Sequence, residues 1–201
     1  NFNARYFDRS FLNETTRDNW QKMARELQDD LTDKNIEKAV KAGLPEEIYA
    51  LSGKEIIEKL KSRRDRIDEF ANEYYLFLVR EVDIRGTDDR DLFIIDRLDD
   101  QRTKVTAREL SQKKGKIKDI FYERTFFSDE TREIRIYGLK DEDKFLVKGD
   151  VKNGIRVHII GGKGRDTIID NSRVRGLQKK TVVYDRPGKT HLKSGRETKI
   201  L

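Results

Sequence analysis

The feature that most constrains the fold is an internal repeat in the second half of the chain. Residues 134–147 align with residues 157–170 at an offset of 23 positions. The matching pairs are Gly138 and Gly161, Lys140 and Lys163, Asp143 and Asp166, and Phe145-Leu146 and Ile168-Ile169. A weaker third copy covers residues 176–185, where Gly176-Leu177 leads to Val182-Val183-Tyr184. Self-similarity at this period is typical of stacked units that cannot bury their apolar faces alone. We therefore predict a short β-roll or β-helix-like repeat of strand, tight turn and strand.

The turn of the second copy also matches a known calcium-binding pattern. Residues 161–168 read Gly-Gly-Lys-Gly-Arg-Asp-Thr-Ile, as in the nonapeptide of calcium-binding β-rolls. The candidate calcium residues are Asp143, Gly161, Gly162, Gly164 and Asp166. Against this, the first copy has Leu139 and Asp141 in place of glycines, and lysine and arginine side chains lie nearby. Glycine and aspartate are also common turn residues without any metal, so we favour a structural role and keep calcium as the alternative.

The strands before the repeat are predicted from a period of two in apolar residues that starts near Glu81. Polar connectors at residues 86–89, 99–101 and 113–116 separate these runs, which favours antiparallel strands in a β-meander. Residues 1–80 are instead predicted to be helical. Thr15 or Thr16 and Thr32 are candidate helix N-caps, and Ser52 with Glu55 has the spacing of a capping box that opens one long helix.

The predicted fold class is therefore α+β, in three parts. Residues 1–80 form a helical subdomain, and residues 81–185 form a β-rich subdomain that contains the repeats. Residues 186–201 form a basic tail or linker. The first residue is Asn1, which is typical of an excised or processed segment, and no apolar run reaches the roughly 20 residues of a membrane helix. We therefore expect a segment that does not itself span a membrane.

Positive charge is concentrated at the C-terminal end of the chain. Residues 171–201 carry a net charge of +7, although the whole chain carries only +6. The candidate residues for an anionic partner are Arg173, Arg175, Lys179, Lys180, Arg186 and Lys189. Tyr184 is the only aromatic residue among them, so we predict at most non-specific, salt-dependent binding and no specific recognition of nucleic acid.

The sequence predicts no catalytic site and no cofactor other than the candidate calcium ion. Cysteine is absent, which excludes disulfides and thiol nucleophiles. The two histidines, His158 and His191, are far apart and lack the spacing of a metal pair or of a nucleophile with its base. Phosphate-binding loops, dinucleotide fingerprints and nucleophile elbows are also missing. We therefore predict that this segment is not an enzyme.

Several segments resemble a region of bacterial envelope proteins that precedes a C-terminal surface-antigen barrel of the BamA type. The resembling segments are Phe7 to Asn13, Leu31 to Val40, Leu44 to Tyr49, Lys59 to Asp65 and Glu133 to Leu139. The resemblance implies a location on the periplasmic side of the outer membrane or at the cell surface. It also implies that the partners are other domains of the same polypeptide, including a downstream barrel.

Some proteins of this kind also carry a metallophosphoesterase domain, whose Asp-x-His and Gly-Asn-His metal-ligand motifs are absent here. A parent protein would therefore hold any such activity in a separate domain. The expected function is a non-catalytic structural or interaction domain of an envelope protein. The alternatives are a calcium-stabilised β-roll module and binding of an anionic surface through the basic tail.

Overall fold

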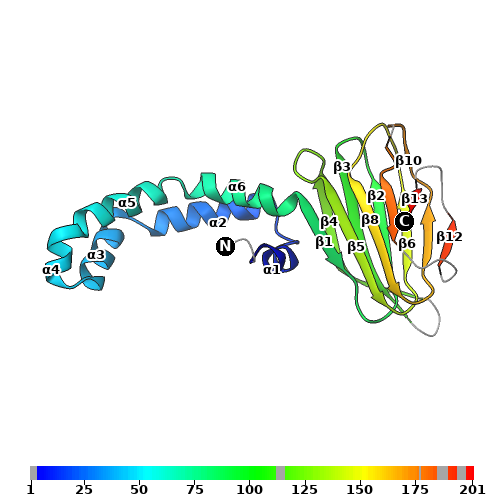
Figure 1. Ribbon diagram of the computed structural model, residues 1–201, viewed down its shortest axis with the longest axis horizontal. Coiled ribbons are helices and arrows are strands. Elements are labelled where there is room, and N and C mark those ends of the chain that lie inside the picture. The colour runs from blue at the N-terminus through cyan, green and yellow to red at the C-terminus, as the bar shows by residue number, and fades with distance from the viewer. Residues whose placement is uncertain (1–3, 112–115, 177, 185–189, 194–197) are drawn as a thin grey trace. The chain divides into compact units, whose positions relative to one another are not determined.

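The computed structural model describes residues 4–111, 116–176, 178–184, 190–193 and 198–201, and it confirms the predicted α+β class (Figure 1). The chain divides into two compact units. One unit is helical and contains Thr15–Phe77, and the other contains Leu78–Leu201 together with the residues up to Glu14. This division differs from the predicted one, because residues before Thr15 belong with the strands and because strands also occur within residues 186–201.

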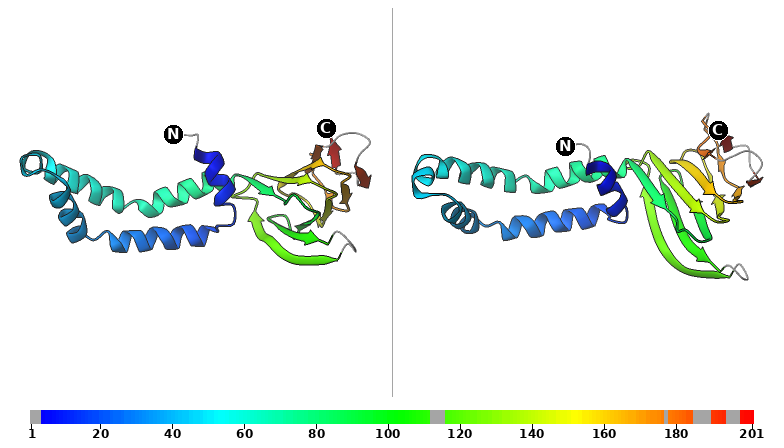
Figure 2. Two further views of the ribbon diagram at one scale, coloured as in Figure 1. Left: turned by 90° about the horizontal axis from the view of Figure 1, so that it is seen from below. Right: turned by 60° about the horizontal axis from the view of Figure 1, so that its bottom comes forward.

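Helices of the helical unit follow one another with short connections. They are α2 (Arg17–Asp30), α3 (Asp33–Gly43), α4 (Glu46–Ile48), the π-helix η1 (Tyr49–Gly53), α5 (Lys54–Arg64) and α6 (Ile67–Val79). Thr16 caps α2 in a capping box with Asn19, and Thr32 caps α3, as those residue types favour. Figure 2 shows that α2 and α6 run alongside each other within this unit.

The predicted capping box of Ser52 and Glu55 is wrong. Ser52 lies inside η1, and α5 begins without a side-chain cap because the chain enters it already in helical conformation. The single long helix is also interrupted, since α5 ends at Arg64 and α6 starts at Ile67. The core near this bend consists of Ile36, Val40 and Ile57, with Leu31, Leu44, Tyr49 and Ile56 packed against it.

Two main sheets form the strand unit. In sheet A all strands are parallel, in the order β1 (Glu81–Arg85), β5 (Glu133–Lys140), β8 (Arg156–Lys163), β11 (Thr181–Tyr184) and β13 (Thr198–Ile200). In sheet B the order is β12 (His191–Lys193), β9 (Thr167–Asp170), β6 (Lys144–Lys148), β2 (Asp91–Arg97), β3 (Arg102–Leu110) and β4 (Ile117–Phe127). Two short parallel strands, β7 (Asp150–Val151) and β10 (Arg173–Val174), pair beside them.

Apart from the β3–β4 hairpin and the short strands β7 and β10, successive strands alternate between the two sheets, so the chain winds in stacked coils. We define coil 1 as β1–β2, coil 2 as β5–β7, coil 3 as β8–β10 and coil 4 as β11–β12. Coils 2 and 3 pair Ile134 with Val157 and Phe145 with Ile168, which is the offset of 23 residues that the sequence alignment uses. The β3–β4 hairpin is inserted between coils 1 and 2, whose paired residues are 52 positions apart.

Two details of the predicted strand arrangement need correction. Among the described strands, only β2, β3 and β4 are antiparallel neighbours, whereas β1 and β2 lie in different sheets and residues 86–89 turn the corner between them. In the third copy, Val182 pairs with His158, so β11 is the first strand of its coil and not the strand after the glycine turn. Leu177 and residues 113–115 lie outside the described residues.

The interior of the coils is apolar, and one end of the stack is covered. Inward side chains such as Ile136, Ile159 and Phe145 are fully buried, and Phe93 stacks on Phe145 with ring centroids 5.0 Å apart.

Helix α1 (Ala4–Phe11) and the residues after it lie against the coil 1 end. Arg9 pairs with Glu81 at 3.3 Å, and the Asn13 amide donates to the Asp83 carbonyl. Among the described residues, no helix has the length and apolar character to cross a membrane.

Candidate functional site

Three buried aspartates form a ladder along the corner between sheets A and B. Asp91, Asp143 and Asp166 occupy the same position in coils 1, 2 and 3, and each is at most 1% exposed. The backbone N–H of Asp91 donates to Oδ1 of Asp143 at 2.8 Å, and the N–H of Asp143 donates to Oδ1 of Asp166 at 2.9 Å. Each of these carboxyl groups therefore binds the backbone of the preceding coil. We call this set the aspartate ladder.

The first rung of the aspartate ladder closes the corner of coil 1. Oδ2 of Asp91 accepts a hydrogen bond from the backbone N–H of Thr87 at 2.6 Å, and the Thr87 hydroxyl also donates to this carboxylate. Burial raises the pKa of Asp91 despite these two donors. The ladder thus ends in a turn that holds a carboxyl group in place with local hydrogen bonds.

Close packing accounts for the glycines around the ladder. A Cβ on Gly138 would overlap Oδ2 of Asp143, and a Cβ on Gly164 would overlap the carbonyl oxygen of Asp141. Gly162 has a φ of +101°, which side chains rarely adopt. In the preceding coil, Leu139 and Asp141 also have positive φ values, of 78° and 65°. The glycine pattern is therefore required by the backbone path and by contact between neighbouring coils.

Asp143 has an unusual electrostatic environment. Its pKa is raised to about 8, chiefly by burial and also by the neighbouring carboxyl groups of Asp166 and Asp91, against the N–H of Asp91 that lowers it. Its Oδ2 is buried and accepts no hydrogen bond from any residue that the structure describes. A carboxyl group with this pKa is mostly protonated at neutral pH, because charging it would place unsolvated like charges on adjacent coils.

The predicted calcium residues are thus brought to one corner, but their oxygens are used differently from calcium ligands. Asp143 and Asp166 each direct Oδ1 at a backbone amide, and the glycines lie in close backbone contacts. No group of three or more acidic or histidine side chains suited to a metal occurs in the part of the chain that the structure describes. Calcium binding stays a prediction that a titration can test.

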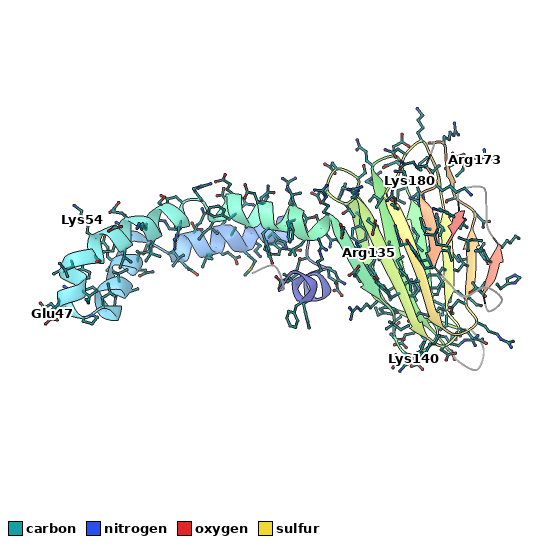
Figure 3. All side chains as sticks on the ribbon, viewed as in Figure 1. Glu47, Lys54, Arg135, Lys140, Arg173 and Lys180 are labelled. Atoms are coloured by element: carbon teal, nitrogen blue, oxygen red, sulfur yellow. The ribbon has the colours of Figure 1, made fainter. Side chains whose placement is uncertain are left out.

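A second polar cluster lies on the outer face of sheet A, around Arg135 (Figure 3). Its guanidinium group contacts Glu81 at 2.6 Å, Glu133 at 2.7 Å and Asp83 at 3.3 Å. Burial would lower the pKa of Arg135, but the hydrogen bonds that it donates to Glu133 and Glu81, together with the nearby negative charges, outweigh this effect and the pKa is raised. Burial would raise the pKa of Glu81, but Arg135, Arg9 and Arg132 together outweigh this effect and the pKa of Glu81 is lowered. These groups hold β1 and β5 together as a cross-strand ion network.

His158 lies next to this network on β8. Its Nε2 is 3.4 Å from Oε2 of Glu133, and its ring stacks on Tyr184 with centroids 5.4 Å apart. Burial lowers the pKa of His158 more than Glu133 raises it, and Arg156 and Arg135 lower it further. A neutral imidazole packed against an aromatic ring is typical of a structural role.

Several of the predicted basic residues are engaged in contacts within the fold. Arg175 pairs with Asp150 at 3.3 Å, and Lys179 Nζ donates to the Thr198 carbonyl at 2.9 Å. Burial lowers the pKa of Lys180, with the nearby Arg156 and Arg97 adding to the effect. Arg173 lies on β10. Arg186 and Lys189 lie outside the described residues.

Sequence reasoning missed the first rung of the ladder. Gly86 precedes Asp91 by five residues, the spacing that separates Gly138 from Asp143 and Gly161 from Asp166. A search for glycine five residues before aspartate at a strand start would have found it. Sequence reasoning also missed Asp170, whose Oδ1 accepts from Ser172 and whose Oδ2 accepts from Thr198 of β13 at 2.8 Å.

Comparison with known proteins adds no relative to this geometry: no family model, curated protein or solved structure matches the chain.

Proposed function

We propose that this chain is a non-catalytic structural and interaction domain of a larger bacterial envelope protein. The observation that carries the non-catalytic part is the aspartate ladder. Its residues are the most deeply buried acidic residues that the structure describes. Two of their carboxyl groups accept hydrogen bonds from the backbone of the neighbouring coil. Groups committed to inter-coil hydrogen bonds stabilise the stack and are not directed at a substrate.

The fold supports the same proposal at a larger scale. We interpret the coils as a short parallel β-helix-like repeat, which extends by adding coils and presents its sheet faces along its length. Contacts of Asn13 with both sheets protect one end of the stack, since its amide donates to Asp83 of β1 and its carbonyl accepts from Tyr122 and Arg124 of β4. A rigid repeat of this kind can position neighbouring domains. The envelope setting itself rests on the sequence resemblance.

Cell fractionation of the full-length parent protein tests the envelope setting. We expect the parent to be recovered with the outer-membrane fraction and to become accessible to protease once the outer membrane is permeabilised. A cytosolic marker and a known periplasmic protein serve as controls for each step. Recovery of the parent in the cytosolic fraction would contradict the proposal.

A calcium titration tests the alternative of a calcium-stabilised module. We expect millimolar calcium to leave the melting temperature unchanged at pH 7, because Oδ1 of Asp143 and Oδ1 of Asp166 accept hydrogen bonds from backbone amides and Asp143 holds a proton. Magnesium at the same concentration controls for ionic strength. A calcium-specific rise in melting temperature that Asp166→Asn abolishes would instead support the calcium module.

A filter-binding assay tests the alternative of an anionic partner. We expect weak retention of single-stranded DNA at low salt that disappears at physiological salt, because Arg175 and Lys179 already have partners within the fold. A matched titration with a neutral polymer controls for sticking to the filter. Retention that persists at physiological salt would show that the basic residues form a true binding surface.

A further inference from the structure

The helical unit has two unlike sides where α2 and α6 run together. On one side lie Arg17, Gln21, Arg25, Asp68, Glu69 and Asn72, which line a polar hollow. On the other side α2 carries Trp20, Met23 and Leu27, and α6 carries Phe70, Tyr74 and Phe77. Spacings of three and four place each set on one face of its helix. We call the second set the aromatic stripe.

Ring contacts join the two halves of the aromatic stripe. Trp20 meets Tyr74 edge-on with centroids 5.9 Å apart, and Tyr74 stacks on Phe77 at 6.1 Å. Much of the stripe is nevertheless open to solvent: Met23 is 65% exposed, Leu27 49%, Phe70 44% and Tyr74 38%. A contiguous apolar patch of a few hundred Å² that is bordered by charged residues marks an interaction surface.

Charges beside the stripe indicate what covers it. Arg66 and Glu73 are one heptad apart on either side of Phe70. Arg66 lies over the Phe70 ring at 4.7 Å and pairs with Glu69 of its own chain at 2.7 Å. In an antiparallel pair of identical helices centred near Phe70, Arg66 of each copy faces Glu73 of the other. This border is self-complementary under a two-fold axis, as an isologous interface requires.

The overall charge of the helical unit is compatible with a second copy of the chain as the partner. Residues 15–77 contain 12 lysines and arginines and 14 aspartates and glutamates, a net charge of −2. Two copies therefore repel each other weakly, while a negatively charged membrane surface gains little from this unit. We propose that the chain self-associates through the aromatic stripe, with α6 of two copies packed antiparallel. This inference does not depend on the envelope setting.

Sedimentation equilibrium of the whole chain over a range of concentrations tests the proposal. We expect wild type to show a concentration-dependent dimer and Phe70→Glu to remain monomeric, because the substitution places a charge at the centre of the contact. Gln21→Glu, on the polar side, is the matched control and should dimerise like wild type. A wild-type chain that stays monomeric throughout, or a Phe70→Glu variant that still dimerises, would overturn the proposal.

Charge exchange tests the orientation and does not depend on how Phe70→Glu folds. Arg66→Glu and Glu73→Arg should each weaken the dimer at least about tenfold, because each places like charges opposite one another. The double variant should recover most of the wild-type affinity. Circular dichroism confirms that each variant is folded. Failure of the double variant to recover would rule out the antiparallel contact between the two α6 helices.

Discussion

Replacing Arg97 with alanine should lower the free energy of unfolding of the strand unit by about 4 kcal/mol. Arg97 ends β2, and its side chain is almost completely buried beside the later coils. Its Nη1 donates to the carbonyl of Ile155 at 2.7 Å, and its Nη2 donates to the carbonyl of Lys180 at 3.1 Å and to the hydroxyl of Thr181 at 3.4 Å. One side chain from coil 1 therefore binds the starts of coils 3 and 4.

The size of this effect follows from what alanine would leave behind. Hydrogen bonds from a charged donor contribute roughly 1.5–3 kcal/mol each, and a buried carbonyl without a donor adds its own desolvation cost. Arg97→Lys should recover only part of the loss, because a single ammonium group cannot reproduce the planar fork that reaches two carbonyls. Gly154 lies close to the guanidinium of Arg97, and Gly149 lies close to its backbone. The neighbouring backbone therefore has little room to repack around a different side chain.

Urea unfolding monitored by circular dichroism measures the effect, and hydrogen exchange in peptides from β8 and β11 locates it. Arg102→Ala is a suitable control, since Arg102 pairs with Asp99 at the exposed start of β3. We expect that control to change stability by less than about 0.5 kcal/mol. An Arg97→Ala protein as stable as the Arg102→Ala protein would show that the buried guanidinium does not hold the coils together.

The sequence was most informative where each coil repeats without interruption. Matched glycines, aspartates and apolar pairs in residues 134–170 predicted the register that joins β5 to β8 and β6 to β9. This register is readable because inward side chains and corner glycines meet the same packing requirement in each coil. The presence of α2 and α3 was also predictable, since Thr16 and Thr32 cap them through local hydrogen bonds.

Interactions distant in sequence limited the rest. The β3–β4 hairpin separates coil 1 from coil 2, so a fixed period of 23 residues cannot find Asp91. Parallel pairing of β1 with β5 depends on a partner 52 residues away, whereas the polar connector after β1 looks like a hairpin turn. The sequence also could not predict the ladder hydrogen bonds or the contacts of Arg97. The position of a charged residue in a strand does not indicate which groups its side chain binds.

The pH dependence of stability should be governed largely by Asp143. Its pKa is near 3.8 in the unfolded chain and about 8 in the folded protein. Below about pH 4 both states are protonated and the full stability is present. As pH rises towards 8 the unfolded chain releases the proton while the folded chain retains it, so the free energy of unfolding falls and levels off above pH 8. We expect a decline of about 2–3 kcal/mol, roughly half of what the full shift gives at about 1.4 kcal/mol per pKa unit, because rearrangement around the charged group relieves part of the cost.

Asp143→Asn isolates this contribution from the other titrating groups. The asparagine oxygen can still accept the Asp91 N–H, and its NH₂ group replaces the protonated oxygen without acquiring charge. The variant should match wild type near pH 4 and exceed its stability by about 2–3 kcal/mol at pH 9, as measured by urea unfolding across this range. Asp129→Asn, in the exposed turn after β4, controls for removal of one carboxyl group. If Asp143→Asn follows the wild-type curve at every pH, then Asp143 is ionised in the folded protein and does not retain its proton as the pH rises.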